Sequence, residues 1–255
     1  MIDIHCHILP GIDDGSEDLE TSLSMVAIAK KQGIDSIIAT PHYIYGQNEN
    51  NYQDIKQAVI DLNKEIEARE LGVKIYPGQE IYLDKYSLDL YKEGILGGLY
   101  DTRYVLVEFP MDKLPKDALD LIYELNILGA KVIVAHPERY NYIIKDPLLI
   151  NKFINEECYF QINSHSITGL FGKEIKNTAK ILIENGVCDF IASDAHTTRR
   201  RKPEILEALQ QAEKYNKGIK NIMKHNQDLL TQDENIIIGD RKLSQKKKLW
   251  GRFGK

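Results

Sequence analysis

Short apolar runs alternate with longer amphipathic segments along most of the chain. The short runs are rich in β-branched residues and are apolar almost without interruption, which is typical of strands buried in a parallel sheet. They predict seven strands: Ile2–Cys6, Ser36–Thr40, Val73–Tyr76, Tyr104–Phe109, Lys131–Ala135, Tyr159–Asn163 and Asp189–Ser193. Between them, apolar residues recur at helical spacing and predict helices over Asp54–Glu70, Asp117–Leu128 and Ile175–Glu184.

This alternation predicts an α/β fold built from consecutive strand–helix units. The length of 255 residues would fit either one domain or two. Seven units without an intervening linker favour a single closed or nearly closed barrel. We therefore expect one barrel domain over residues 1–240 and a separate basic tail over residues 241–255.

The charge of the chain is divided unevenly between these two parts. The 33 basic and 38 acidic residues give a net charge of −5, but seven of the basic residues and none of the acidic ones lie in residues 241–255. Residues 1–240 thus carry 26 basic against 38 acidic residues, a net charge of −12. A body this acidic is a poor generic binder of nucleic acid, so we expect no nucleic-acid partner.

The sequence also bears on the compartment. No apolar run approaches the roughly 18 residues that a membrane span requires, and the first ten residues lack the basic start and long apolar stretch of a signal peptide. Three cysteines, an odd number without close pairing, fit a reducing environment. We therefore expect a cytoplasmic protein with no integral membrane segment.

Side chains that can bind metal follow or end six of the seven predicted strands. Catalytic groups of parallel α/β folds stand at these carboxyl ends. A single histidine or glutamate at such a position is more often a capping or hydrogen-bonding residue. So many imidazoles and carboxylates on one face would be costly without cations, which favours a polynuclear metal site. The candidates are His5, His7, His42, Glu80, Glu108, His136, Asp194 and His196.

The types of ligand indicate which metals and which kind of reaction the site suits. Imidazole and carboxylate donors suit manganese, iron or zinc, and Glu80 and Glu108 could bridge two ions of a hydrolytic cluster. In the turn after the first strand, Asp14 is a candidate for a further ligand, whereas the chemistry of an aspartate–glycine turn suffices to explain Asp13.

Arginines follow the later candidate ligands, at Arg139 and in the run 199–201, and they suggest that the site binds a phosphate. For Arg199 and Arg200, a solvated basic run is an equal alternative.

These motifs, in this order, resemble the PHP (polymerase and histidinol phosphatase) family of phosphoesterases. Within that family, five stretches are similar to the bacterial tyrosine-protein phosphatases of capsular and exopolysaccharide loci. The similarity runs from Met1 to about Pro203. The five stretches are MIDIHCH from Met1, LPGIDDG from Leu9, EFP from Glu108, AHPER from Ala135 and SDAH from Ser193.

The resemblance implies a distorted (β/α)7 barrel with up to three manganese ions, although iron or zinc is possible. One ion would be held by His5, His7, Glu80 and Asp194; a second by Glu80, Glu108 and His136; and a third by Asp14, His42 and His196. Arg139 and Arg201 would bind the substrate phosphate, the second matched by its offset of seven from Asp194. A hydroxide that bridges two ions would attack phosphotyrosine, and the implied substrate is the tyrosine-rich tail of a membrane-anchored kinase that drives polysaccharide export.

Two other functions remain open from the sequence. A small-molecule phosphatase, such as one acting on histidinol phosphate, or a nuclease-like phosphoesterase could have a nearly identical metal site. Alternatively, the protein could be a non-catalytic, metal-stabilised module that docks on a kinase complex through its tail. That tail combines Lys246, Lys247 and Lys248 with Leu249, Trp250 and Phe253, a pattern found on surfaces that contact anionic lipid, although a disordered tail is the simpler interpretation.

Overall fold

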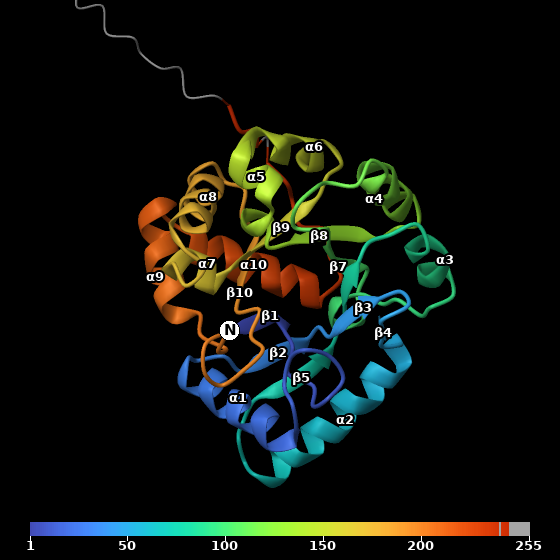
Figure 1. Ribbon diagram of the computed structural model, residues 1–255. Coiled ribbons are helices and arrows are strands. Elements are labelled where there is room, and N and C mark those ends of the chain that lie inside the picture. The colour runs from blue at the N-terminus through green and yellow to red at the C-terminus, as the bar shows by residue number, and fades with distance from the viewer. Residues whose placement is uncertain (240, 245–255) are drawn as a thin grey trace, which may run out of the picture.

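The computed structural model describes residues 1–239 and 241–244, and its strands lie in two sheets (Figure 1). The smaller sheet contains three parallel strands in the order β1 (Ile2–Cys6), β2 (Ser36–Ala39) and β5 (Lys74–Pro77). The larger sheet has seven strands in the order β10-β9-β8-β7-β6-β3-β4, parallel except for the short β3–β4 hairpin. Its strands are β10 (Phe190–Ala192), β9 (Tyr159–Asn163), β8 (Lys131–Ala135), β7 (Tyr104–Glu108), β6 (Glu80–Tyr82), β3 (His42–Ile44) and β4 (Asn48–Glu49).

Helices surround the strands, with α1 and α2 beside the smaller sheet and α3 to α9 around the larger one (Figure 1). The α-helices are α1 (Leu19–Lys31), α2 (Tyr52–Ala68), α3 (Ser87–Lys92), α4 (Ala118–Ile127), α5 (Asn141–Lys145), α6 (Ile150–Asn155), α7 (Ser164–Thr168), α8 (Lys173–Glu184), α9 (Leu206–Tyr215) and α10 (Ile219–Thr231). Single 3-10 turns occupy Leu99–Asp101, Pro137–Arg139 and Pro147–Leu149. None of the helices in the described part of the chain is long and apolar enough to cross a membrane.

The predicted α/β fold is confirmed, and each of the seven segments predicted as strands contains a strand. A closed sheet is not seen among the described strands, because their hydrogen bonding divides them between two sheets. The two sheets meet where β1 approaches the segment that follows β10. There, Cys6 forms a backbone bridge with Ala195, and the Asp194 amide donates to the His5 carbonyl at 2.8 Å.

The three predicted helices are present within two residues of the expected bounds, but the pattern does not predict α10. The buried side of α10 includes two polar residues, Asn226 and Gln227, beside its apolar ones. Both are hydrogen-bonded to backbone carbonyls: the Gln227 side chain donates to Ile2 and the Asn226 side chain to Asp189. Their burial is therefore compensated by specific partners in the strands that α10 covers.

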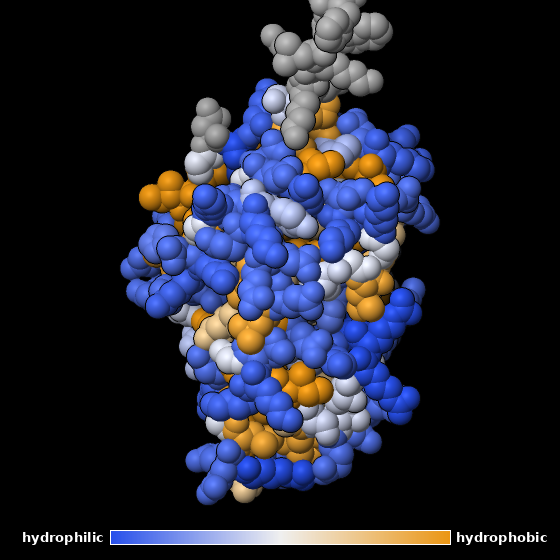
Figure 2. Space-filling model, turned by 90° about the vertical axis from the view of Figure 1, so that its left-hand side faces the viewer, coloured by the Kyte–Doolittle hydropathy of each residue, from blue (hydrophilic) through white to orange (hydrophobic). Residues whose placement is uncertain are grey.

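The end of the described chain packs on the body of the fold. Most of the expected basic tail lies outside the described residues, but Arg241 pairs with Asp189 and Leu243 is 5% exposed. Arg241 and Leu243, at the start of the expected tail, thus pack on the fold. The face in Figure 2 is largely polar and shows apolar residues only in small, separate groups.

Candidate metal centre

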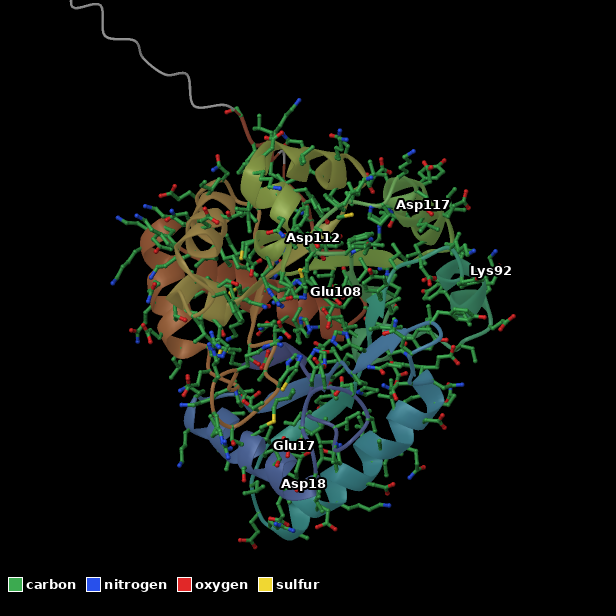
Figure 3. The ribbon with its side chains drawn as sticks, viewed as in Figure 1. Glu17, Asp18, Lys92, Glu108, Asp112 and Asp117 are labelled. Atoms are coloured by element: carbon green, nitrogen blue, oxygen red, sulfur yellow. The ribbon has the colours of Figure 1, made fainter. Side chains whose placement is uncertain are left out.

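Nine candidate ligands come from seven places in the chain and meet in one cluster. β1 supplies His5 and is followed by His7, and the turn after it supplies Asp14. β3 begins at His42, β6 begins at Glu80 and β7 ends at Glu108. His136 directly follows β8, whereas Asp194 and His196 follow β10. Figure 3 shows Glu108 near the centre of the molecule, in contrast to Asp117 and Lys92 at its periphery.

Ligand atoms gather in three groups, each with all of its atoms within 4.8 Å of one another. The groups share His7, His42 and Glu80, so they form one continuous cluster. The first is the set implied for the first ion. The second group contains His42 where the resemblance implies His136. The third group contains His7 in addition to the three implied ligands. The groups are His5, His7, Glu80 and Asp194; His42, Glu80 and Glu108; and His7, Asp14, His42 and His196.

Glu80 lies at the centre of the cluster. Its Oε2 is 3.2 Å from a ring nitrogen of each of three histidines, His5, His7 and His42. Its Oε1 is 2.9 Å from Nε2 of His136, and the same nitrogen is 3.5 Å from Glu108. His136 therefore lies beside the second group, as the resemblance implies. A carboxylate that reaches several imidazoles with both oxygens is well placed to bridge cations.

Several contacts are difficult to satisfy by hydrogen bonding alone and fit bound cations. Nε2 of His5 and Nε2 of His7 are 3.2 Å apart, although both also face the carboxylates of Glu80 and Asp194. Three buried atoms of the candidate ligands have no hydrogen-bond partner among the described residues: Nδ1 of His42, Nδ1 of His136 and Oδ1 of Asp194. Because buried polar atoms are normally paired, and because the donors are nitrogen and oxygen, the cluster suits manganese, iron or zinc.

Protonation states in the cluster are mixed. Burial acts to lower the pKa of His5 and of His7, but the carboxylates of Glu80 and Asp13 raise these two pKa values above the usual histidine value. Burial lowers the pKa of His136 and of His196 to about 4, which leaves these imidazoles neutral at pH 7. Burial acts to raise the pKa of Glu80, but the neighbouring His5 and His42 hold it well below the usual glutamate value. Burial and the charge of Glu80 raise the pKa of Glu108 to about 9. Metals bind neutral imidazoles and ionised carboxylates, and a cation beside Glu108 would favour its ionised form.

Three residues that were not predicted as ligands form hydrogen bonds that orient the predicted ligands. Asp13 accepts from Nδ1 of His7 at 2.7 Å and from the His42 amide at 3.1 Å, in addition to its turn bond from Gly15. Gln161 Oε1 accepts from Nδ1 of His5 at 2.9 Å, and Gln161 Nε2 donates to Asn163. Asn163 in turn donates to Oδ2 of Asp194 at 2.6 Å. Such outer partners set the tautomer and direction of ligands.

Substitution of Gln161 by Leu should weaken metal binding about 10- to 100-fold, the usual cost of losing an outer partner of a ligand. The variant leaves His5 Nδ1 without its acceptor and Asn163 without its donor. Manganese affinity measured by calorimetry would test this. Gln53→Leu, at an exposed position of α2, is the control and should bind manganese as the native protein does. Equal affinity in the Gln161 variant would show that the amide is not needed to orient His5.

Two arginines stand on the far side of Asp194 from the histidines. Arg139 Nη1 is 3.1 Å and Arg201 Nη2 is 2.6 Å from the same oxygen, Asp194 Oδ2. The guanidinium of Arg139 also lies 5.0 Å from the ring centre of Phe171. Arg201 is partly buried, whereas Arg199 and Arg200 are exposed. Among the three consecutive arginines, the structure brings only Arg201 to the cluster.

The cluster and the arginines line one cavity of about 210 Å³. His165 stands outside this lining; its Nε2 donates to the carbonyl of Lys202 at 2.8 Å, next to Arg201. It therefore contacts the loop that carries Arg201. The lining consists of Asp14, His42, Ile44, Glu80, Tyr82, Glu108, His136, Arg139, Asp194, His196 and Arg201.

The fold and this cavity define an α/β protein with a candidate polynuclear metal centre next to a pair of arginines suited to an anion. The chain belongs to the CpsB/CapC family of capsular polysaccharide synthesis proteins, whose family model matches residues 1–232. It is 37% identical to the tyrosine-protein phosphatase YwqE of Bacillus subtilis, over 99% of this chain and 100% of the relative. It is 34% identical to the tyrosine-protein phosphatase CpsB of Streptococcus agalactiae, over 82% of this chain and 88% of the relative.

Solved structures agree with this placement. One from a study of YwqE of Bacillus subtilis and CpsB of Streptococcus pneumoniae, described as metal-dependent tyrosine phosphatases, matches with a TM-score of 0.92 and 36% identity. The match covers 96% of this chain and 100% of that chain. A histidinol phosphate phosphatase of Lactococcus lactis matches with a TM-score of 0.55 and 14% identity, over 88% of this chain and 93% of that one, and so shares the fold.

Proposed function

We propose that the protein is a metal-dependent protein-tyrosine phosphatase that hydrolyses the phosphate ester of phosphotyrosine. The position of Asp194 is the main support for this proposal. Its Oδ1 lies beside the candidate histidine ligands, and its Oδ2 contacts both arginines. Metal ligands and phosphate-binding groups thus meet at a single side chain. The relatives named above as tyrosine-protein phosphatases, at 34–37% identity, support the same activity.

We propose manganese as the metal, with up to three ions. His5, His7, Glu80 and Asp194 would hold the first; Glu80, Glu108 and His136 the second; and Asp14, His42 and His196 the third, with His7 beside it. Divalent ions bound there would lower the pKa of a water molecule and neutralise phosphate oxygens. The leaving phenol has a pKa near 10, far below that of an alkyl alcohol, so the reaction depends less on a general acid than hydrolysis of phosphoserine does.

Arg139 and Arg201 would bind and orient the phosphate. Each guanidinium uses one terminal nitrogen on Asp194, which leaves further N–H groups for phosphate oxygens. The buried Nε of Arg201 has no partner within the described part of the chain and is one such donor. Charge-assisted, paired bonds of this type are the usual way in which proteins hold phosphate.

We further infer that the two sheets are parts of a distorted (β/α)7 barrel, because β1 bonds to the segment after β10 at the junction described above. The barrel would form one phosphoesterase domain, with the basic residues beyond Leu243 as its tail. The substrate that we propose is the tyrosine-rich cytoplasmic tail of a membrane-anchored kinase of polysaccharide export, which the protein would meet in the cytoplasm. The family's link to capsular polysaccharide synthesis supports this choice.

Replacing Arg139 by Ala should lower kcat/KM for a phosphotyrosine peptide about 100-fold, since one charge-assisted clamp on the phosphate is lost. The effect would be measured with the manganese-loaded protein. Arg199→Ala, which removes an exposed arginine near the cavity, is the control and should stay within about twofold of the native value.

The same assay separates the proposed activity from its alternatives. The native protein should hydrolyse the phosphotyrosine peptide with a higher kcat/KM than histidinol phosphate, and it should leave single-stranded DNA intact. A preference for histidinol phosphate would identify a small-molecule phosphatase. Full activity of Arg139→Ala would mean that this arginine does not hold the phosphate.

A further inference from the structure

The cavity has an apolar part that the metal ligands and the arginines do not explain. Ile44 and Tyr82 line it, and each stands two residues after a candidate ligand in the same strand, His42 in β3 and Glu80 in β6. Because side chains two residues apart point to the same face of a strand, Ile44 and Tyr82 share the face of the ligands. They lie roughly 6.5 Å further along the strands, toward the carboxyl edge.

Strand pairing places these side chains in one row. His42 is paired with Glu80, and the same register continued by two residues places Ile44 beside Tyr82. Tyr82 is in turn paired with Glu108 of β7. The inner row thus contains the candidate ligands His42 and Glu80, and the outer row contains Ile44 and Tyr82 beside Glu108. Both outer side chains are partly exposed, whereas Glu80 is 1% exposed, so the outer row is nearer to solvent.

Aromatic residues stand behind this row. Phe109 directly follows Glu108, the residue of β7 that is paired with Tyr82. Tyr142 stacks on Tyr140 with ring centres 5.2 Å apart and an angle of 14° between the planes. Tyr140 is fully buried and packs edge-on against Phe109. The rings of Phe109, Tyr140 and Tyr142 thus form an aromatic cluster that begins one residue after the partner of Tyr82 in β7.

The arginines come from other strands. Arg139 follows β8 and Arg201 follows β10, whereas Ile44 and Tyr82 lie on β3 and β6, with β7 between the two pairs in the sheet. A phosphate held by the arginines and the cluster would therefore direct its ester group toward one of the remaining sides of the cavity. Of the eleven side chains that line the cavity, Ile44 and Tyr82 are those without a formal charge or an imidazole ring.

We propose that Ile44 and Tyr82 form a subsite for the aromatic ring of the substrate and so select aryl over alkyl phosphate esters. This inference rests on the proposed function and assigns part of its specificity to two residues. An aromatic ring stacks on tyrosine and packs on isoleucine with a gain that a serine or threonine ester cannot obtain. Selectivity for phosphotyrosine then comes from binding of the ring as well as from the lower pKa of the phenol.

Two inhibitors that differ only in the ring would test the subsite: phenylphosphonate and methylphosphonate, assayed against hydrolysis of a phosphotyrosine peptide by the manganese-loaded protein. The native protein should bind phenylphosphonate more tightly. In Tyr82→Ala, the ratio of the two inhibition constants should fall by about tenfold, while methylphosphonate binds as before. Tyr82→Phe keeps the ring and should keep the ratio, and Ile44→Ala should lower the ratio less than Tyr82→Ala does.

Tyr123→Ala, at an exposed position on α4, is the matched control and should leave both constants unchanged. Metal content is measured in every variant, because Tyr82 lies beside Glu108. Equal weakening of both inhibitors in Tyr82→Ala, or no change in either, would overturn the subsite. A native protein without preference for phenylphosphonate would also overturn it, while its hydrolysis of the phosphotyrosine peptide would leave the proposed function in place.

Discussion

Removing divalent metal from the protein should abolish hydrolysis of phosphotyrosine, with a loss of at least about 1,000-fold, and adding manganese should restore it. The residues around the cavity would provide ligands for cations and arginines for phosphate, and metal ions would supply the activated water and much of the charge neutralisation. The measurement is kcat/KM after exhaustive chelation with EDTA and after titration with manganese, iron and zinc. Activity that survives chelation would contradict a metal mechanism.

The variant Asp194→Asn should lose as much activity as removal of the metal does. Addition of manganese should not restore the activity of this variant. Asp194 has a left-handed backbone, with φ of 50°. Asparagine tolerates this conformation about as well as aspartate, so the change removes charge with little backbone strain. It leaves Arg139 and Arg201 without their shared carboxylate. Asp54→Asn, on an exposed part of α2, removes the same charge elsewhere and should behave as the native protein does.

The ligand cluster could be predicted from the sequence because strand ends are easy to locate. A buried parallel strand is a short apolar run, and the first polar residues after it necessarily lie at the carboxyl edge. His136 after β8 and Asp194 after β10 follow this rule directly, and both turn the chain with a positive φ, 33° and 50°. Such strained conformations at non-glycine residues often mark functional sites. The structure brings together all nine of the side chains that the sequence singles out.

The remaining parts of the site carried weaker signals. Glu80 follows the third predicted strand as expected, but it also begins a separate strand of three residues, β6, in the other sheet, which was not predicted. A run so short has no detectable period. Gln161 and Asn163 lie within β9 and are uncharged amides, so nothing in their type indicates a role. Their spacing of two, which places both on one face of the strand, was the available signal.

The sequence pattern also gave no signal for the attachment of residues 241–243 to the fold, and loss of this attachment should lower stability. Ending the chain after Asp240 should lower the free energy of unfolding by about 3–5 kcal/mol, because it removes one partner of a buried ion pair. Arg241 Nη1 lies 2.7 Å from Asp189 Oδ1, and the two side chains are 8% and 10% exposed. Arg241 Nη2 also donates to the carbonyl of Cys158, and its guanidinium lies 5.0 Å from the ring centre of Phe160.

Urea unfolding of three chains would measure this contribution: the full chain, a chain that ends after Ser244 and a chain that ends after Asp240. The chain ending after Ser244 keeps Arg241 and Leu243 and should be as stable as the full chain. Lys242→Met, at an exposed position, should change little, whereas Arg241→Met should reproduce most of the loss caused by the shorter truncation. The double variant Asp189→Leu/Arg241→Met should recover part of the stability, since no buried charge is left alone.

Catalysis should respond differently from stability in the same chains. Asp189 precedes β10 and Asp194 follows it, so the ion pair and the ligand cluster lie at opposite ends of one strand. At temperatures where the protein stays folded, the chain ending after Asp240 should therefore keep the native kcat/KM and the native manganese affinity. A large fall in kcat/KM with unchanged unfolding would mean instead that residues 241–244 act on the site itself. Loss of stability without loss of kcat/KM would mean that residues 241–244 stabilise the fold and take no part in catalysis.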